Sequence, residues 1–397
     1  MPFVIYIFAV SAFALGLAEF VPIGLTSIMA DELSVGVETA GATVTAYALG
    51  AVFAAPVLTA LTANWPRKKV MLIAAFVFTV GALVAPITAN ISIILLARFA
   101  AGMGHGLFMA AASSTAARLA GPHRAGSAVA VVFGGFTLAL AVGVPISIYL
   151  SETVSWRLIL GAVGIFGAIG FIGLLFGMRD PLPTLSAGKN SPWVNLATLL
   201  HGKLLLGALV TVFAYAGSFA AYTYITPLLN EVTGVEMTSI SAFMLLYGVT
   251  AAVGNVLGGK VTDRLGTNAA STIVVVGVAV VSLAMWIGSS SPFAMAILVA
   301  LLGLFTYAAV PALQARLIKV AELHIPNAQG VAAGLNIAGF NSGIALGSVL
   351  GGITITKLGL EYVGLIGAVA ASLGILLVIM QISAAKSAMH AAKATPS

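Results

Sequence analysis

Two charged residues, Glu19 and Arg98, lie inside long apolar stretches of the sequence. If these stretches cross a membrane, each charge costs at least about 2.5 kcal/mol and marks a functional site by default. Desolvation favours the protonated form of a carboxyl group, whereas a nearby guanidinium favours the ionised form. Movement of Arg98 or of a substrate would then load or unload a proton on Glu19. The alternative is a structural ion pair that fixes the packing of two helices.

Further polar residues share one helical face with Arg98. Steps of three and four residues lead from it to Gly102, His105, Met109 and Ser113. His105 suits a proton relay or a substrate contact, although a hydrogen-bonded packing role explains a lone histidine equally well. No other residue offers metal-ligand spacing, so we expect no metal site.

Aromatic residues with polar tips mark two more segments. Their rings and hydroxyl groups suit a pocket for an amphiphilic or hydroxylated solute, because they combine apolar contact with hydrogen bonding. Packing in the protein interior is the alternative for any single member. The segment 204–230 contributes Tyr215, Ser218, Phe219, Tyr222 and Thr226, and the segment 292–315 contributes Tyr307, Pro311 and Gln314.

Membrane-spanning helices are the elements that must position these residues. Charged residues make up 7% of the chain, against about 25% on average, and the mean hydropathy is +1.13. This composition excludes a soluble enzyme, a disordered chain and a nucleic-acid-binding protein. Charge-free runs of about 20 residues or more predict twelve spans, with the run 265–315 divided at Ser289 to Pro292. The first run contains Glu19 and lacks a preceding basic segment, so we expect a span there and not a cleaved signal peptide.

The basic residues are divided unequally between the two sides of the predicted bundle. Fourteen Lys and Arg residues fall in the loops and tail of one side, whereas only Arg157 and Lys357 fall on the other. Short loops rich in Lys and Arg stay in the cytoplasm. We therefore expect a multi-pass protein of the cell (inner) membrane with both termini in the cytoplasm.

The chain divides into two similar halves of six spans each. Tyr47 matches Tyr247 at an offset of 200, and Gly143 matches Gly347 at an offset of 204. Because six is an even number, both halves have the same orientation and form a parallel repeat, which is typical of transporters. The expected units are an N-terminal half at 1–178, a cytoplasmic linker at 179–203, a C-terminal half at 204–385 and a cytoplasmic tail at 386–397.

Small residues recur at every fourth position in spans 5 and 11. Such stripes let helix backbones approach closely. Because the stripes occupy equivalent places in both halves, we expect a seam between the halves that slides or rocks; packing alone is the alternative. The stripes are Gly135, Ala139, Gly143 and Ser147 in span 5, and Gly339, Gly343, Gly347 and Gly351 in span 11.

One loop resembles a motif of the major facilitator superfamily. Residues 259–266 are similar to the cytoplasmic sequence G-x-x-x-D-R-x-G of that family. The resemblance implies that Asp263 caps or pairs across neighbouring helices and so holds the outward-open state. Ala63 and Asn64 replace the Asp-Arg pair in the first-half copy. The matching residues, a predicted cytoplasmic gate motif, are Gly259, Asp263, Arg264 and Gly266.

Other motifs are similar to one branch of this superfamily. Arg98-x-x-x-Gly102-x-Gly104 resembles a span 4 motif associated with proton coupling in drug and sugar exporters. Residues 19–25, His105 and residues 221–227 together look like the sugar-efflux and arabinose-exporter-like branch of the drug:proton antiporters. The likeness covers nearly the whole chain. It implies that spans 1, 4, 7 and 10 line a central cavity and that spans 3, 6, 9 and 12 face lipid.

These observations favour a secondary active transporter. Val261 follows Lys260 where a nucleotide-binding loop needs Ser or Thr, so a gradient must supply the energy. We expect proton-coupled efflux of a sugar or a drug-like amphiphile by alternating access, with Glu19 as the proton carrier. The protein is expected to be a monomer without enzymatic activity or cofactor, whose partners are the substrate, protons and the bilayer but no nucleic acid. The alternatives are uptake by symport or uniport, and a non-transporting sensor or scaffold.

Overall fold

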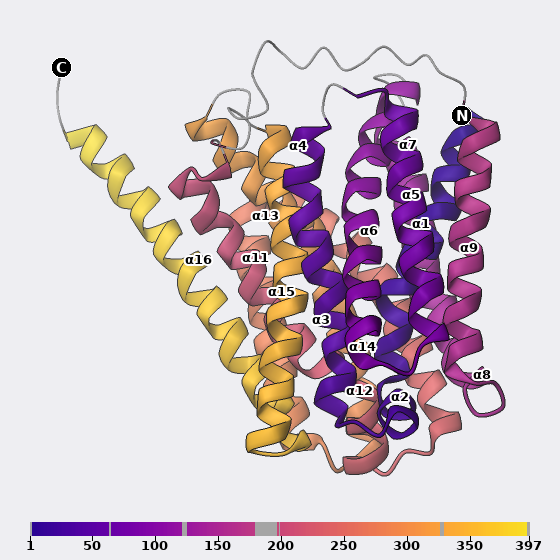
Figure 1. Cartoon of the computed structure of the whole chain (residues 1–397). Helices are drawn as coiled ribbons and strands as arrows, with labels where there is room; N and C mark the ends of the chain where they lie inside the picture. Colours follow the sequence, from indigo (N-terminus) through magenta and orange to yellow (C-terminus); the bar gives the residue numbers. More distant parts are fainter. Residues whose placement is uncertain are drawn as a thin grey trace.

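The computed structural model is a bundle of long helices (Figure 1). It describes residues 2–62, 65–120, 125–178, 197, 199–325 and 329–394. These residues form helices and turns and contain no strand. A bilayer offers no water to satisfy backbone polar groups, so a spanning chain pairs them within each helix. The predicted all-α membrane fold is therefore confirmed.

Two of the spans are interrupted by π-helical turns, at Ala54–Leu58 and Ala139–Gly143. Pro56 lies in the first turn and Pro145 follows the second, where each removes a backbone donor. The first half contains α1 (Phe3–Gly24), α2 (Thr26–Leu33), α3 (Val37–Phe53), α4 (Thr59–Leu61), α5 (Arg67–Val84), α6 (Ile91–Ala120), α7 (Ala125–Leu138), α8 (Val144–Leu150) and α9 (Trp156–Gly177). The second half contains α11 (Gly202–Tyr222), α12 (Ile225–Pro227), α13 (Met237–Gly288), α14 (Pro292–His324), α15 (Gln329–Lys357) and α16 (Val363–Ala394).

The number of spans agrees with the twelve predicted. Eleven helical segments in the described residues are long and apolar enough to cross a membrane, and one of them, α13, has 52 residues. A straight helix of that length would measure roughly 78 Å, more than twice the thickness of a hydrocarbon core. Gly266 interrupts it with φ 81° and ψ 161°, a conformation that glycine adopts readily. The segment α13 therefore supplies two spans.

The helices pack as two halves. In the first half α1 packs against α7 and α9, while α6 packs against α3 and α5. In the second half α11 packs against α15 and α16, while α13 packs against α14. The halves meet where α3 contacts α15 and where α8 contacts α13. Most of the predicted linker, residues 179–196 and 198, lies outside the described residues, so its position stays a prediction.

Hydrogen bonds join the two halves at one end of the bundle. The start of α1 and the end of α16 both lie at the top of Figure 1, and α2 and α12 lie at the opposite end, which we call the far end. There the Ser348 hydroxyl donates to the carbonyl oxygen of Gly41 (3.1 Å), and that of Thr226 donates to the carbonyl oxygen of Ile23 (3.3 Å). The two halves are thus joined at the far end.

The spans that the resemblance assigns to lipid, 3, 6, 9 and 12, are α5, α9, the second part of α13, and α16. All four expose rows of apolar side chains, but so does the first part of α13, with Leu245, Val249 and Val253. Such rows suit contact with lipid tails, because apolar side chains cost nothing there. Examples are Phe76 and Val80 on α5, Ile169 and Ile172 on α9, Ile273 and Val280 on α13, and Leu376 and Met380 on α16.

The small-residue stripes lie inside each half, so the predicted seam between the halves is wrong. A Cβ on Gly135 would overlap the carbonyl oxygen of Ala9 in α1, and one on Gly347 would lie 2.7 Å from the carbonyl oxygen of Ala216 in α11. Both halves therefore repeat one internal helix contact, which explains why the stripes are equivalent. The same packing on α1 or α11 holds for Gly143, Gly339, Gly343 and Gly351.

The last helix extends beyond the predicted end of its span at residue 385. It continues to Ala394 through a stretch rich in alanine, the best helix former. Much of the predicted cytoplasmic tail is therefore helical.

The predicted orientation is testable because the chain contains no cysteine. Thr153 lies at the far end and Asn268 follows the break at Gly266, and both are exposed. In intact cells a membrane-impermeant maleimide should label Thr153→Cys but not Asn268→Cys, which should react only after permeabilisation. The reverse labelling pattern would place both termini outside.

Close packing of α7 on α1 is testable with two adjacent glycines. Gly135→Ala should destabilise the protein by about 1–3 kcal/mol, because the added methyl group meets the α1 backbone. Gly134→Ala is the matched control, since a Cβ there meets nothing within 4 Å. Thermal unfolding in detergent measures both. Equal effects would contradict the proposed contact.

Candidate functional site

Glu19 lies in the last third of α1, and its carboxylate faces His105. Its Oε2 is 3.4 Å from His105 Nδ1, and both side chains are buried. Neither atom has a hydrogen-bond partner with good geometry among the described residues. A small movement would therefore make or break one hydrogen bond between them. Such a contact can hold a single proton between two titratable groups.

Arg98 is buried beside this pair but does not form an ion pair with Glu19. Its Nη1 donates to the carbonyl oxygen of Ala18 and its Nε donates to that of Thr43 (3.2 Å). The guanidinium also lies 4.4 Å from the ring centre of Tyr47, within cation–π range. Arg98 thus ties α6 to α1 and α3. The described part of the chain contains two ion pairs, and neither joins Arg98 to Glu19.

Proline creates one of the acceptors that Arg98 uses. Pro22 lies inside α1 and has no N–H to donate to the carbonyl group four residues earlier, which is that of Ala18. An unpaired buried carbonyl group costs about 1–3 kcal/mol, so a donor from another helix is needed. Arg98 supplies it. The spacing from Glu19 to Pro22 therefore fixes where the guanidinium binds, one peptide before the carboxylate.

Two glycines in α6 bring the neighbouring helices close. A Cβ on Gly102 would overlap the carbonyl oxygen of Tyr47 in α3, and one on Gly104 would lie 2.5 Å from that of Ala74 in α5. The two positions lie on opposite sides of α6, so α3 and α5 both approach it. This packing places the rings of Tyr47 and His105 5.5 Å apart. The two glycines of the Arg98-x-x-x-Gly102-x-Gly104 pattern are thus needed for the close approach of α3 and α5 to α6.

Tyr47 belongs to the site although we did not predict it from its residue type. Its hydroxyl donates to the carbonyl oxygen of Leu15 (3.2 Å), and its ring lies next to both Arg98 and His105. The repeat comparison pairs Tyr47 with Tyr247, which is also buried. The signal that could have identified Tyr47 is the presence of a tyrosine at the same place in both halves.

The second half contains a cluster of aromatic rings. Tyr222 stacks on Tyr247 with ring centres 4.1 Å apart and planes 14° apart, and Tyr307 lies 6.3 Å from Tyr247. On the same helix as Tyr222, the rings of Tyr215 and Phe219 lie 5.9 Å apart. The structure thus brings together four of the predicted substrate residues and adds Tyr247.

The tyrosine hydroxyls of this cluster differ in their partners. The Tyr215 hydroxyl donates to the carbonyl oxygen of Thr306 (3.2 Å), and Thr306 donates to the hydroxyl of Ser218 (2.8 Å). The Tyr222 hydroxyl is buried and has no hydrogen-bond partner among the described residues. A buried hydroxyl without a partner is unfavourable by itself. It is therefore an available contact for a ligand.

Other predicted residues lie away from these two clusters. Thr226 is hydrogen-bonded to α1 at the far end, and Met109 is buried in α6. The gate motif lies at the opposite end, where Asp263 and Arg264 are exposed and form no ion pair within the described residues. The role of that motif stays a prediction. The side chain of Ser113 lies outside the described residues.

Metal binding has no support in the described residues. No group of three or more His, Asp or Glu side chains there could hold a metal ion. The candidate site combines one buried ionisable cluster in the first half with one aromatic cluster in the second.

Comparison with known proteins identifies the family. The family model described as Major Facilitator Superfamily matches residues 8–323 and 238–396. The chain belongs to this superfamily. The helical bundle is similar to that of a mutant of the nucleoside transporter NupG, with a TM-score of 0.74, 16% identity and coverage of 95% of this chain and 98% of NupG. That likeness supports the fold alone.

Three superfamily relatives are similar in sequence. The inner membrane transport protein YdhP of Escherichia coli K12 is 35% identical, over 94% of each chain. A chloramphenicol resistance protein of Streptomyces lividans is 31% identical, over 66% of this chain and 68% of its own. A probable sugar efflux transporter of Helicobacter pylori strain J99 is 27% identical, over 91% of each chain. The chain is thus a multi-pass membrane protein of a transporter family.

The unpartnered Tyr222 hydroxyl leads to a prediction about stability. Tyr222→Phe should leave the free energy of unfolding unchanged or raise it, because it removes a buried polar group that has no partner among the described residues. Tyr215→Phe is the matched control and should cost about 0.5–1.5 kcal/mol, since its hydroxyl is hydrogen-bonded. Thermal unfolding without substrate measures both. A larger loss for Tyr222→Phe would show that its hydroxyl has a structural partner.

Proposed function

We propose that this protein exports a small solute in exchange for protons. The observation that supports this most directly is the contact between Glu19 and His105, two buried titratable groups 3.4 Å apart. An ionisable pair at membrane depth is expensive and is common in proton pathways. Glu19 is the proton carrier in this proposal, and His105 shares its proton.

Arg98 makes both protonation states of Glu19 tolerable. With Glu19 ionised, the nearby guanidinium balances its charge. With Glu19 protonated, Arg98 is still held by the carbonyl groups of Ala18 and Thr43 and by the ring of Tyr47. A buried cation left without such partners would cost several kcal/mol. The proton can therefore leave and return without Arg98 losing its place.

The aromatic cluster is the proposed substrate site. The stacked rings of Tyr222 and Tyr247 offer apolar contact, and the free hydroxyl of Tyr222 offers a hydrogen bond. The names of two relatives, a chloramphenicol resistance protein and a probable sugar efflux transporter, support export of a small organic solute. We therefore propose a sugar or drug-like amphiphile as substrate.

Alternating access would proceed by movement of one half against the other. In the present structure the halves are joined at the far end by the hydrogen bonds from Ser348 and Thr226. Opening this end requires those bonds to break while the packing inside each half stays intact. In the proposed orientation both termini lie in the cytoplasm. The far end therefore faces the outer side of the inner membrane.

The proposal is tested with the purified protein in liposomes under an imposed pH gradient. Sugars, nucleosides and chloramphenicol are added in turn while the lumenal pH is followed. Wild type should move protons when a substrate is added, and Glu19→Gln should abolish this movement, because an amide cannot carry the proton. Glu322→Gln is the matched control, since Glu322 is exposed at the end of α14.

Other outcomes would overturn parts of this proposal. Equal substrate flux in wild type and Glu19→Gln without proton movement would establish a uniporter. Substrate and protons moving in the same direction would establish symport. No flux of any compound tested, in a protein that binds none of them, would favour a sensor or scaffold.

A further inference from the structure

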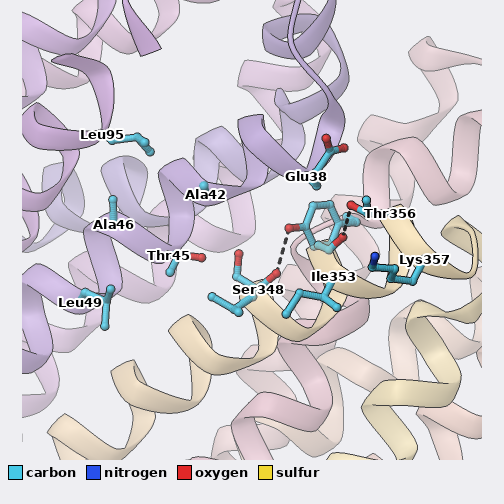
Figure 2. Close-up of a pocket in the computed structure, with 13 residues that line it drawn as sticks. Glu38, Ala42, Thr45, Ala46, Leu49, Leu95, Ser348, Ile353, Thr356 and Lys357 are labelled. Atoms are coloured by element: carbon cyan, nitrogen blue, oxygen red, sulfur yellow. Dashed lines mark hydrogen bonds between the residues drawn. The ribbon is translucent and has the colours of Figure 1, made fainter. Parts of the chain in front are cut away.

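An apolar groove lies between the two halves near the far end (Figure 2). It has a volume of about 440 Å³ and runs between α3 and α15, with Leu95 of α6 at one side. Apolar side chains form much of its walls, charged residues lie at one end, and the sticks in Figure 2 come from both halves. The α3 wall includes Ala42, Ala46 and Leu49, and the α15 wall includes Val349, Ile353 and Thr356.

The groove is open to the surroundings of the bundle. Leu49, Val349 and Ile353 are 46%, 44% and 55% exposed although they lie within membrane-spanning helices. No described part of the chain covers these side chains. In a bilayer the molecules that reach an apolar surface at this depth are lipids.

The length of the groove fits one leaflet. It extends along α3 from Glu38 to Leu49, twelve residues or roughly 16 Å of helix. Along α15 it extends from Ser348 to Lys357, ten residues or roughly 13 Å. Half of a hydrocarbon core about 30 Å thick is about 15 Å. An extended acyl chain that enters at the membrane surface would fill it.

The mouth of the groove has two charges of opposite sign. Glu38 lies in the first turn of α3, and Lys357 is the last residue of α15. Both line the groove, and the described residues contain no ion pair between them. A headgroup with an ammonium group and a phosphate group complements this arrangement. The ammonium would face Glu38 and the phosphate would face Lys357.

We propose that this groove binds a zwitterionic phospholipid of the phosphatidylethanolamine class. One acyl chain lies between α3 and α15, and the headgroup lies between Glu38 and Lys357. The site is separate from the aromatic and ionisable clusters. It does not depend on the proposed proton coupling or on the identity of the solute.

The bound lipid favours the state in which the far end is closed. Tyr224 lies in the groove, and its hydroxyl donates to the carbonyl oxygen of Ser348 (2.9 Å). Ser348 in turn donates to Gly41 of α3. The groove therefore exists only while α3 and α15 are in contact. A ligand that binds one state better than another shifts the population toward it.

Photo-crosslinking in proteoliposomes tests the site directly. The probe is phosphatidylethanolamine with a diazirine in the middle of one acyl chain, diluted into phosphatidylglycerol vesicles that contain the full-length protein. Mass spectrometry should locate the crosslinks mainly within 42–49 and 349–356. Excess unlabelled phosphatidylethanolamine should suppress these crosslinks but not those on the exposed face of α16. This competition uses the wild-type protein, so it stays informative if a variant fails to fold.

Matched variants test the shape of the groove and its charges. Ala46→Phe should fill the groove and reduce its crosslinking about tenfold. Leu376→Phe, on the exposed face of α16, should leave groove crosslinking unchanged. Glu38→Gln should remove the preference for the ethanolamine probe over a matched phosphatidylglycerol probe, because it removes the partner of the ammonium group. Lys357→Gln should reduce the crosslinking of both probes, because both contain the phosphate group.

Three results would overturn the proposal. Crosslinks spread evenly over all lipid-facing helices would show that the groove binds no particular lipid. Equal labelling by the two probes in wild type would refute the assignment of the headgroup. Displacement of the probe by chloramphenicol or a sugar, with no competition by phosphatidylethanolamine, would make the groove a route for solute.

Discussion

The buried guanidinium of Arg98 is the interaction on which the arrangement of the first half depends. It joins three helices by bonding to two backbone carbonyl groups and a ring face. Local features favour these contacts: Pro22 leaves the Ala18 carbonyl group without its helical donor, and Gly102 allows α3 to approach closely. A cation held in this way does not need the carboxylate for its own stability. Glu19 is therefore left free to face His105.

The two halves share one fold but differ in chemistry. Tyr47 and Tyr247 occupy equivalent places, yet Tyr47 faces a guanidinium and an imidazole, whereas Tyr247 stacks on Tyr222. The first half thus concentrates its buried ionisable groups, and the second concentrates rings. A duplicated scaffold permits this difference, because each copy can change its side chains while its helix packing stays the same. Small residues preserve that packing, as Gly135 and Gly347 do within their own halves.

The sequence predicted correctly those features that depend on one helix alone. Hydropathy predicted the spans. The cost of a buried charge singled out Glu19 and Arg98, which are both buried, while their role in proton coupling stays a prediction. Sequence reasoning was less successful for contacts between helices. A stripe of small residues has the same pattern whichever helix it packs on, so the predicted seam between the halves was wrong. The carbonyl partners of Arg98, the role of Tyr47 and the lipid-facing groove depend on the distances between helices, which residue spacing does not contain.

Packing of glycine against backbone is frequent inside each half and also occurs between them, where Gly248 of α13 meets Ala141, but the contacts at the far end include hydrogen bonds that can break singly. Inside each half, helices pack through glycines against backbone, which leaves little freedom to slide. Between the halves, far-end contacts include single hydroxyl bonds to carbonyl groups, each with a net contribution of about 0.5–1.5 kcal/mol. Such contacts can break without unfolding either half. The proposed lipid groove requires the contact between α3 and α15. Membrane composition would therefore affect the opening of the far end, because this contact must break in that step.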